Sequence, residues 1–73
     1  MDGIEVTEPL ETASRAVAEG EAQIAHQRTL IARLEATAED TSEACALLNA
    51  LAKRQAERLQ DLAAIIRSFL PQR

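Results

Sequence analysis

His26 and Cys45 are the only histidine and the only cysteine of the chain, so they are the first candidates for chemistry. A carboxylate-bridged di-iron site in a helical bundle uses Glu-x-x-His, but the residue three before His26 is Gln23. Cys45 has no second cysteine and no adjacent histidine to work with. We interpret His26 as a surface residue and Cys45 as a small apolar residue packed near a turn. A disulfide between two copies would require their turns to meet.

Other chemical motifs are absent from the sequence. It has no Gly-rich phosphate loop, no nucleophile paired with a base and no cluster with metal-ligand spacing. We therefore expect a protein that is not an enzyme, with no cofactor, no bound metal and no small-molecule ligand.

Lys53, Arg54 and Arg58 form the one basic cluster, and Glu57 and Asp61 lie among them. The net charge of the chain is -4, whereas phosphate binding needs clustered Lys and Arg. We interpret the cluster as a solvated, salt-bridged face and expect no nucleic-acid ligand. RNA binding by a hairpin dimer through Arg54 and Arg58 is a remote alternative.

The composition predicts an all-α protein of one domain. The chain has 73 residues, one aromatic residue, two glycines and two prolines, and good helix formers dominate it. No apolar run is long enough to span a membrane, and the acidic start lacks the apolar region of a secretory signal. We expect a cytoplasmic protein without membrane contact.

Apolar residues recur at alternating steps of three and four, which predicts two helices with a coiled-coil-like seam. We expect an acidic flexible leader at 1–8 and a helical hairpin at 9–70, followed by a tail at 71–73. Within the hairpin, helix 1 should cover about 9–37, the turn 38–41 and helix 2 about 42–69. The predicted interface and core residues are Val17, Gly20, Ile24, Gln27, Leu30, Ile31, Leu34, Leu47, Leu48, Leu51, Gln55, Leu59, Leu62, Ile65, Ile66 and Phe69.

The turn has recognisable helix signals. Asp40 can cap helix 2, and Glu43, three residues later, can reach back to the N–H of the cap. Pro71 disfavours helical backbone at Leu70 and should end the second helix. Folding the chain about this turn places Gly20 opposite the large side chain of Leu59.

Gln27 and Gln55 interrupt the apolar seams about one helical turn apart on opposite helices. They could form a binding site for a polar ligand, or a polar layer that fixes the register of the helices. We favour the polar layer. Gly20 disfavours a helix by about 1 kcal/mol relative to Ala, which close packing beneath a large side chain would explain.

A lone two-helix hairpin of this size leaves one side of each helix uncovered and is expected to be marginally stable. The leading hypothesis is a non-enzymatic scaffolding module that dimerises into a four-helix bundle. The alternative is a small regulatory or accessory subunit whose apolar face docks on one larger protein.

The order of landmarks resembles a group of small uncharacterised bacterial proteins. The landmarks are Ala18-Glu19-Gly20-Glu21, Ile24-x-x-Gln27-x-x-x-Ile31-x-x-Leu34, Asp40-Thr41, and Ala44-x-x-Leu47-Leu48-x-x-Leu51-x-x-x-Gln55. The resemblance covers roughly residues 18–62 and implies a bacterial origin without a mechanism. Two departures are visible, because those proteins usually have a Gly in the turn, where this chain has Ala38-Glu39, and often a His near the position of Arg58.

Overall fold

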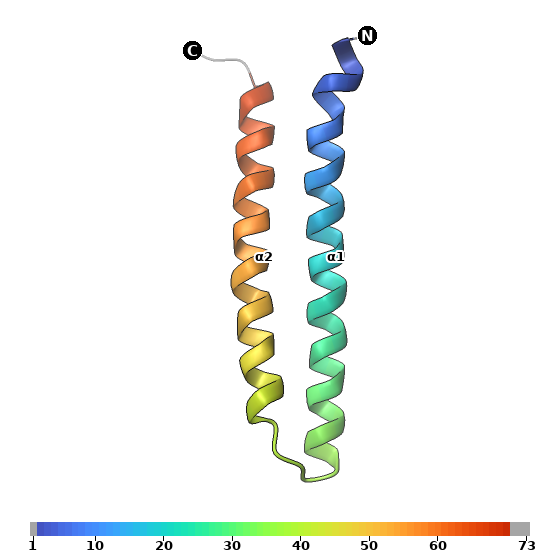
Figure 1. The fold of residues 1–73 in the computed structure, drawn as a ribbon, viewed down its shortest axis with the longest axis vertical. Coiled ribbons are helices and arrows are strands. Elements are labelled where there is room, and N and C mark those ends of the chain that lie inside the picture. Colours follow the sequence, from blue (N-terminus) through green and yellow to red (C-terminus); the bar gives the residue numbers. More distant parts are fainter. Residues whose placement is uncertain (1, 71–73) are drawn as a thin grey trace.

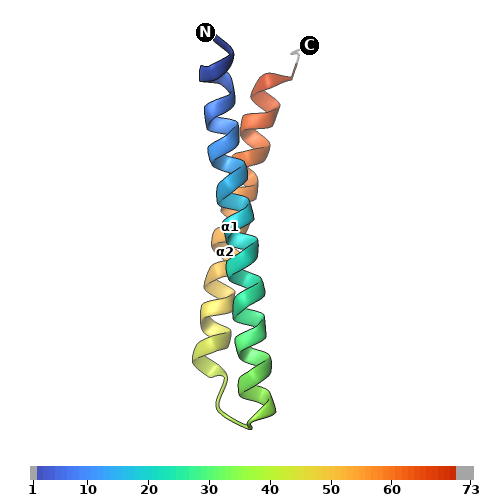
Figure 2. The same cartoon turned by 90° about the vertical axis from the view of Figure 1, so that its right-hand side faces the viewer.

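The protein is an antiparallel pair of helices in the computed structural model, which describes the backbone of residues 2–70 and the side chains of residues 8–70. Helix α1 covers Asp2–Ala36 and helix α2 covers Ser42–Phe69. The start of α1 and the end of α2 lie at one end of the hairpin, and the turn lies at the other (Figure 1). The side view shows the two helices crossing at a shallow angle (Figure 2). The predicted all-α hairpin is confirmed for the described residues.

The first helix is longer than predicted. It begins at Asp2 rather than near residue 9 and ends at Ala36, so the backbone of residues 2–8, which we expected to be a leader, is helical. Acidic residues favour the positive end of a helix dipole, which supports an early start. Pro9 lies inside the helix, where its ring nitrogen cannot donate the usual hydrogen bond. The predicted tail at 71–73 lies outside the described residues.

Helix α1 ends in a Schellman motif. The N–H of Glu39 donates to the carbonyl oxygen of Leu34 at 2.8 Å, and the N–H of Ala38 donates to that of Glu35 at 3.1 Å. This motif places one residue in the left-handed region, and here that residue is Ala38, with φ 58°. Glycine adopts such a backbone without steric penalty, whereas alanine has a Cβ that disfavours it.

Helix α2 begins at Ser42, as predicted, but its N-cap lies one residue later than the predicted cap. Thr41, not Asp40, occupies the N-cap position, and its side chain makes no capping hydrogen bond. Asp40 still accepts a hydrogen bond from the first turn of α2. Its Oδ1 accepts from the N–H of Ser42 at 2.9 Å and from the Ser42 hydroxyl at 2.7 Å. The hydrogen bonds described for residues 8–70 do not include the predicted return bond from Glu43.

The end of α2 agrees with the prediction. Leu70 has extended backbone at φ -81° and ψ 149°, the conformation favoured before a proline. Its N–H donates to the carbonyl oxygen of Arg67 at 3.2 Å, which satisfies one of the last carbonyls of the helix.

Replacing Ala38 with Gly should stabilise the protein by about 0.5–1 kcal/mol, because Gly adopts positive φ without the steric penalty of a Cβ. Urea unfolding followed by circular dichroism at one fixed protein concentration measures the change. Ala36→Gly is the matched control, since residue 36 is helical and the same substitution should destabilise there. Equal losses at both positions would contradict the left-handed assignment.

Acid should remove a stabilising contribution of Asp40. The hydrogen bonds from the hydroxyl and the N–H of Ser42 lower the pKa of this carboxyl below its ordinary value of 3.8. A lowered folded-state pKa stabilises the protein above pH 3.8, and the contribution disappears as the pH falls through the folded-state pKa. Asp40→Asn keeps an acceptor but removes the charge. The stability difference between the two proteins should shrink between pH 7 and pH 2.5, and a constant difference would refute this.

Candidate interaction surface

The interior of this hairpin is polar. Gln27 and Gln55 are exposed by 5% and 6%, and no apolar side chain among residues 8–70 is buried to that degree. Buried polar groups are tolerated only when they are hydrogen-bonded. The contacts of the two glutamine amides therefore decide how the helices fit together.

Each glutamine donates to the backbone of the opposite helix. Nε2 of Gln27 in α1 lies 2.9 Å from the carbonyl oxygen of Ala44, and Nε2 of Gln55 in α2 lies 2.9 Å from that of Val17. A backbone carbonyl has two lone pairs, so it can accept a side-chain donor in addition to its helical bond. The two bonds clasp the hairpin in opposite directions. We call them the glutamine clasps.

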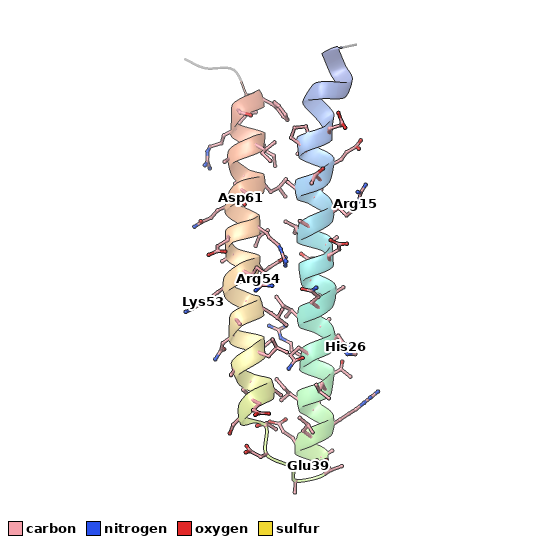
Figure 3. All side chains as sticks on the ribbon, in the orientation of Figure 1. Arg15, His26, Glu39, Lys53, Arg54 and Asp61 are labelled. Atoms are coloured by element: carbon pink, nitrogen blue, oxygen red, sulfur yellow. The ribbon has the colours of Figure 1, made fainter. Side chains whose placement is uncertain are left out.

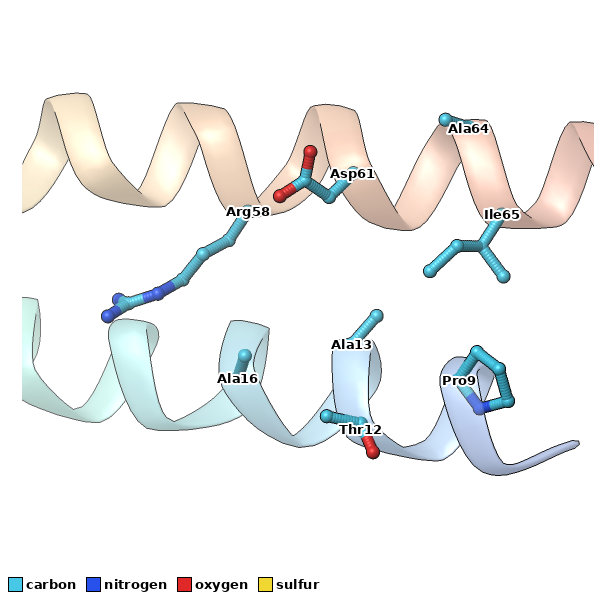
Figure 4. Close-up of a pocket in the computed structure, with 8 residues that line it drawn as sticks. All are labelled: Pro9, Thr12, Ala13, Ala16, Arg58, Asp61, Ala64 and Ile65. Atoms are coloured by element: carbon cyan, nitrogen blue, oxygen red, sulfur yellow. The ribbon is translucent and has the colours of Figure 1, made fainter.

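Gly20 provides the space for the second clasp. A Cβ at residue 20 would lie 2.7 Å from Cδ of Gln55 and 2.6 Å from Nη1 of Arg58, and closer still to Oε1 of Gln55. Figure 4 shows the Arg58 side chain extending from α2 to α1. Oε1 of Gln55 and Nη1 of Arg58 are both buried without a hydrogen-bond partner, so an acceptor and a donor lie together over the glycine.

These contacts correct the predicted register by about one helical turn. Gly20 faces Gln55 and Arg58 rather than Leu59, because the missing Cβ accommodates an amide instead of a leucine. Gln27 and Gln55 also do not share one polar layer. Gln27 lies level with the first turn of α2, whereas Gln55 lies level with Gly20, about 10 Å away along α1 at 1.5 Å per residue.

The predicted interface residues fall into three classes of exposure. Gly20, Gln27 and Gln55 are buried. The partly buried ones are Val17, Ile24, Ile31, Leu34, Leu48, Leu51, Leu62 and Ile65. The exposed ones are Leu30, Leu47, Leu59, Ile66 and Phe69, with exposures of 38–50%. The hairpin by itself therefore leaves most of its apolar seam partly accessible.

One face of the hairpin has two grooves between the helices. A groove of about 640 Å³ near the chain ends is lined by Pro9, Thr12, Ala13, Ala16, Arg58, Asp61, Ala64 and Ile65. The second groove, near the turn, is lined by Gln27, Leu30, Leu34, Asp40, Glu43, Ala44 and Leu47. Both grooves lie on the same flank of each helix, since their residues follow one another at steps of three and four. We call this flank the groove face.

The opposite flank is the more apolar one. On each helix, the residue three positions after a buried seam residue lies on one flank of the seam, and the residue four positions after it lies on the other flank. Counted from Gly20 and Gln55, this places Gln23 and Arg58 on the groove face. Ile24 and Leu59 lie on the opposite flank. We call this flank the apolar face. On α1 it consists of Leu10, Val17, Ile24 and Ile31, and on α2 of Cys45, Ala52, Leu59 and Ile66. None of these eight side chains is polar, whereas Gln23 and Arg58 interrupt the groove face.

The residues first considered for chemistry do not converge. His26 is exposed and points away from α2 (Figure 3). Cys45 is an exposed free cysteine whose Sγ lies 3.8 Å from Oγ1 of Thr41. No group of three or more His, Cys, Asp or Glu among the described residues could hold a metal ion. Arg58 turns into the helix interface, so it does not share a solvated face with Arg54 as predicted.

Comparisons with protein families, curated proteins and solved structures give no match. The resemblance to the small bacterial group therefore stays a prediction. Within the described residues, neither helix has an apolar stretch that could cross a membrane.

Gly20→Ala should destabilise the hairpin although Ala is the better helix former by about 1 kcal/mol. The new Cβ displaces the Gln55 amide, and a buried amide without its hydrogen bond loses about 1–3 kcal/mol. In a Gln55→Ala background the same substitution should become stabilising. Ala22→Gly, at an exposed position of α1 away from the apolar face, measures the ordinary Gly–Ala difference. Additive effects in urea unfolding would contradict the clasp.

Proposed function

We propose that the protein is a non-enzymatic self-association module in which two hairpins pack into a four-helix bundle and serve as a scaffold. The observation that carries the proposal is the inverted distribution of polarity. Two glutamines are the most buried side chains, whereas Leu59, Ile66 and Phe69 are exposed by 47%, 44% and 44%. A soluble protein gains most of its stability from apolar burial, and this single hairpin has little of it.

A second copy of the chain can bury the exposed apolar side chains. Full burial of an exposed leucine or isoleucine contributes about 1.5–3 kcal/mol, so covering a half-exposed one contributes roughly half of that. Covering the apolar face of two chains at once buries sixteen side chains, eight from each copy, and the resulting four helices enclose a common core. Folding and association are then coupled, so the stability of the module depends on its concentration.

The scaffold role needs no chemistry beyond this association. A chain with a single cysteine can form no internal disulfide, which fits a reducing compartment, and we propose a cytoplasmic location. Docking of the same apolar face on one larger protein is the alternative, and the mass of the protein in solution distinguishes the two.

Light scattering on a sizing column, across a range of concentrations, should give about twice the chain mass of 7.9 kDa. Leu59→Glu should reduce the mass to that of the monomer, because it introduces a charge into the apolar face. Ala50→Glu introduces the same charge at an exposed position on the side of α2 away from the apolar face and should leave the dimer intact. A wild-type monomer at every concentration would overturn the proposal and favour docking on another protein.

A further inference from the structure

The edges of the apolar face carry opposite charges on the two helices. The edge of α1 runs through Glu11, Ser14, Ala18, Glu21, Ala25, Arg28, Ala32 and Glu35, with three acids and one base. The edge of α2 runs through Asn49, Lys53, Ala56, Gln60, Ala63 and Arg67, with two bases and no acid. All six charged residues are exposed. An edge that flanks an uncovered apolar face contacts whichever helix covers that face.

From these edges we propose that the second copy packs on the apolar face with its turn at the same end, so that α1 of each copy lies against α2 of the other. The inference rests on the proposed self-association and adds the partner surface and its orientation. A two-fold axis parallel to the helices generates this bundle. The acidic edge of α1 then meets the basic edge of α2 at two equivalent contacts.

The register of the hairpin assigns the pairs. Gly20 lies level with Gln55, and the helices are antiparallel, so Glu21 lies level with Lys53 and Arg54. An axis parallel to the helices keeps these levels unchanged between copies. Of the two basic residues, Lys53 belongs to the edge of the apolar face. Glu21 of one copy is therefore the partner of Lys53 in the other.

The opposite orientation is electrostatically poorer. With the turns at opposite ends, α1 lies against the second α1 and α2 against the second α2, so each edge faces a copy of itself. The edge of α2 would then place bases against bases and lack acids to balance them. Opposite charges across an interface fix orientation, and like charges select against the alternative.

A charge-reversal cycle on the full chain tests the proposal. Glu21→Lys and Lys53→Glu should each raise the dimer dissociation constant roughly tenfold, since each creates two like-charge contacts. The double variant has the net charge of the wild type and should return to within about threefold of it. Glu19→Lys and Arg54→Glu make the same changes in charge on the groove face, and they and their combination should leave the constant unchanged.

A distance measurement tests the orientation independently. Glu39 lies at the tip of the turn (Figure 3), and Glu39→Cys combined with Cys45→Ser provides one labelling site per chain. Spin labels at residue 39 should be close together in the dimer. Labels separated by most of the 55 Å length of the hairpin would overturn the proposed orientation. So would a double variant as weak as both single variants. In either case a dimeric wild type would leave the proposed self-association standing.

Discussion

A buried amide must have a hydrogen-bond partner, and this requirement determines the arrangement of the hairpin. Nε2 of Gln27 and Nε2 of Gln55 satisfy it by donating to backbone carbonyls of the opposite helix, both at 2.9 Å. Such a bond adds only about 1 kcal/mol when made, but a slipped register would leave the amide buried and unpaired at greater expense. The clasps therefore act mainly by destabilising alternative alignments. Apolar contacts among leucines and alanines discriminate far less between registers.

The sequence was sufficient for the architecture but not for the alignment. Periodic leucines and the signals near Asp40 predicted two helices and placed α2 at 42–69. The register was wrong because we paired residues by folding the chain symmetrically about the predicted turn, which placed Gly20 opposite Leu59. The register depends on the hydrogen bond from the Gln55 amide to the carbonyl oxygen of Val17, and the periodicity of apolar residues does not predict that bond. Arg58 was predicted to lie on a solvated face, because a charged residue beside a seam is usually exposed, but it lies in the helix interface.

The turn shows a similar limit. Two helices joined by a short segment were predictable from the capping signals, but the left-handed residue was not identifiable, because alanine is a strong helix former. The carbonyls of Leu34 and Glu35 need donors once α1 ends, and a left-handed residue at position 38 directs its own N–H and that of Glu39 to them. The hydrogen bonds that close the end of α1 therefore outweigh the preference of alanine for negative φ. The same reasoning explains why glycine would suit this position.

The side chains that fix the register of the helices lie on a different surface of the hairpin from the apolar side chains that could stabilise the fold by burial. Among the described residues, the two buried side chains are the glutamines that fix the register, whereas the large apolar side chains are only partly buried or are exposed, because one hairpin cannot cover them. Polar layers within helical bundles are known to specify alignment at a cost in stability. In the proposed function, a second hairpin covers this exposed apolar surface and completes the core.

The two helices are nearly equivalent in their contacts and differ in charge. Gln27-x-x-x-Ile31-x-x-Leu34 in α1 corresponds to Gln55-x-x-x-Leu59-x-x-Leu62 in α2, and each glutamine donates to the other helix. An approximate two-fold axis therefore relates the helices within one hairpin. Because of this axis, apolar packing alone would barely distinguish a second α1 from a second α2 as the neighbour. The acidic edge of α1 and the basic edge of α2 break the equivalence, so charge is the property that can select the neighbour.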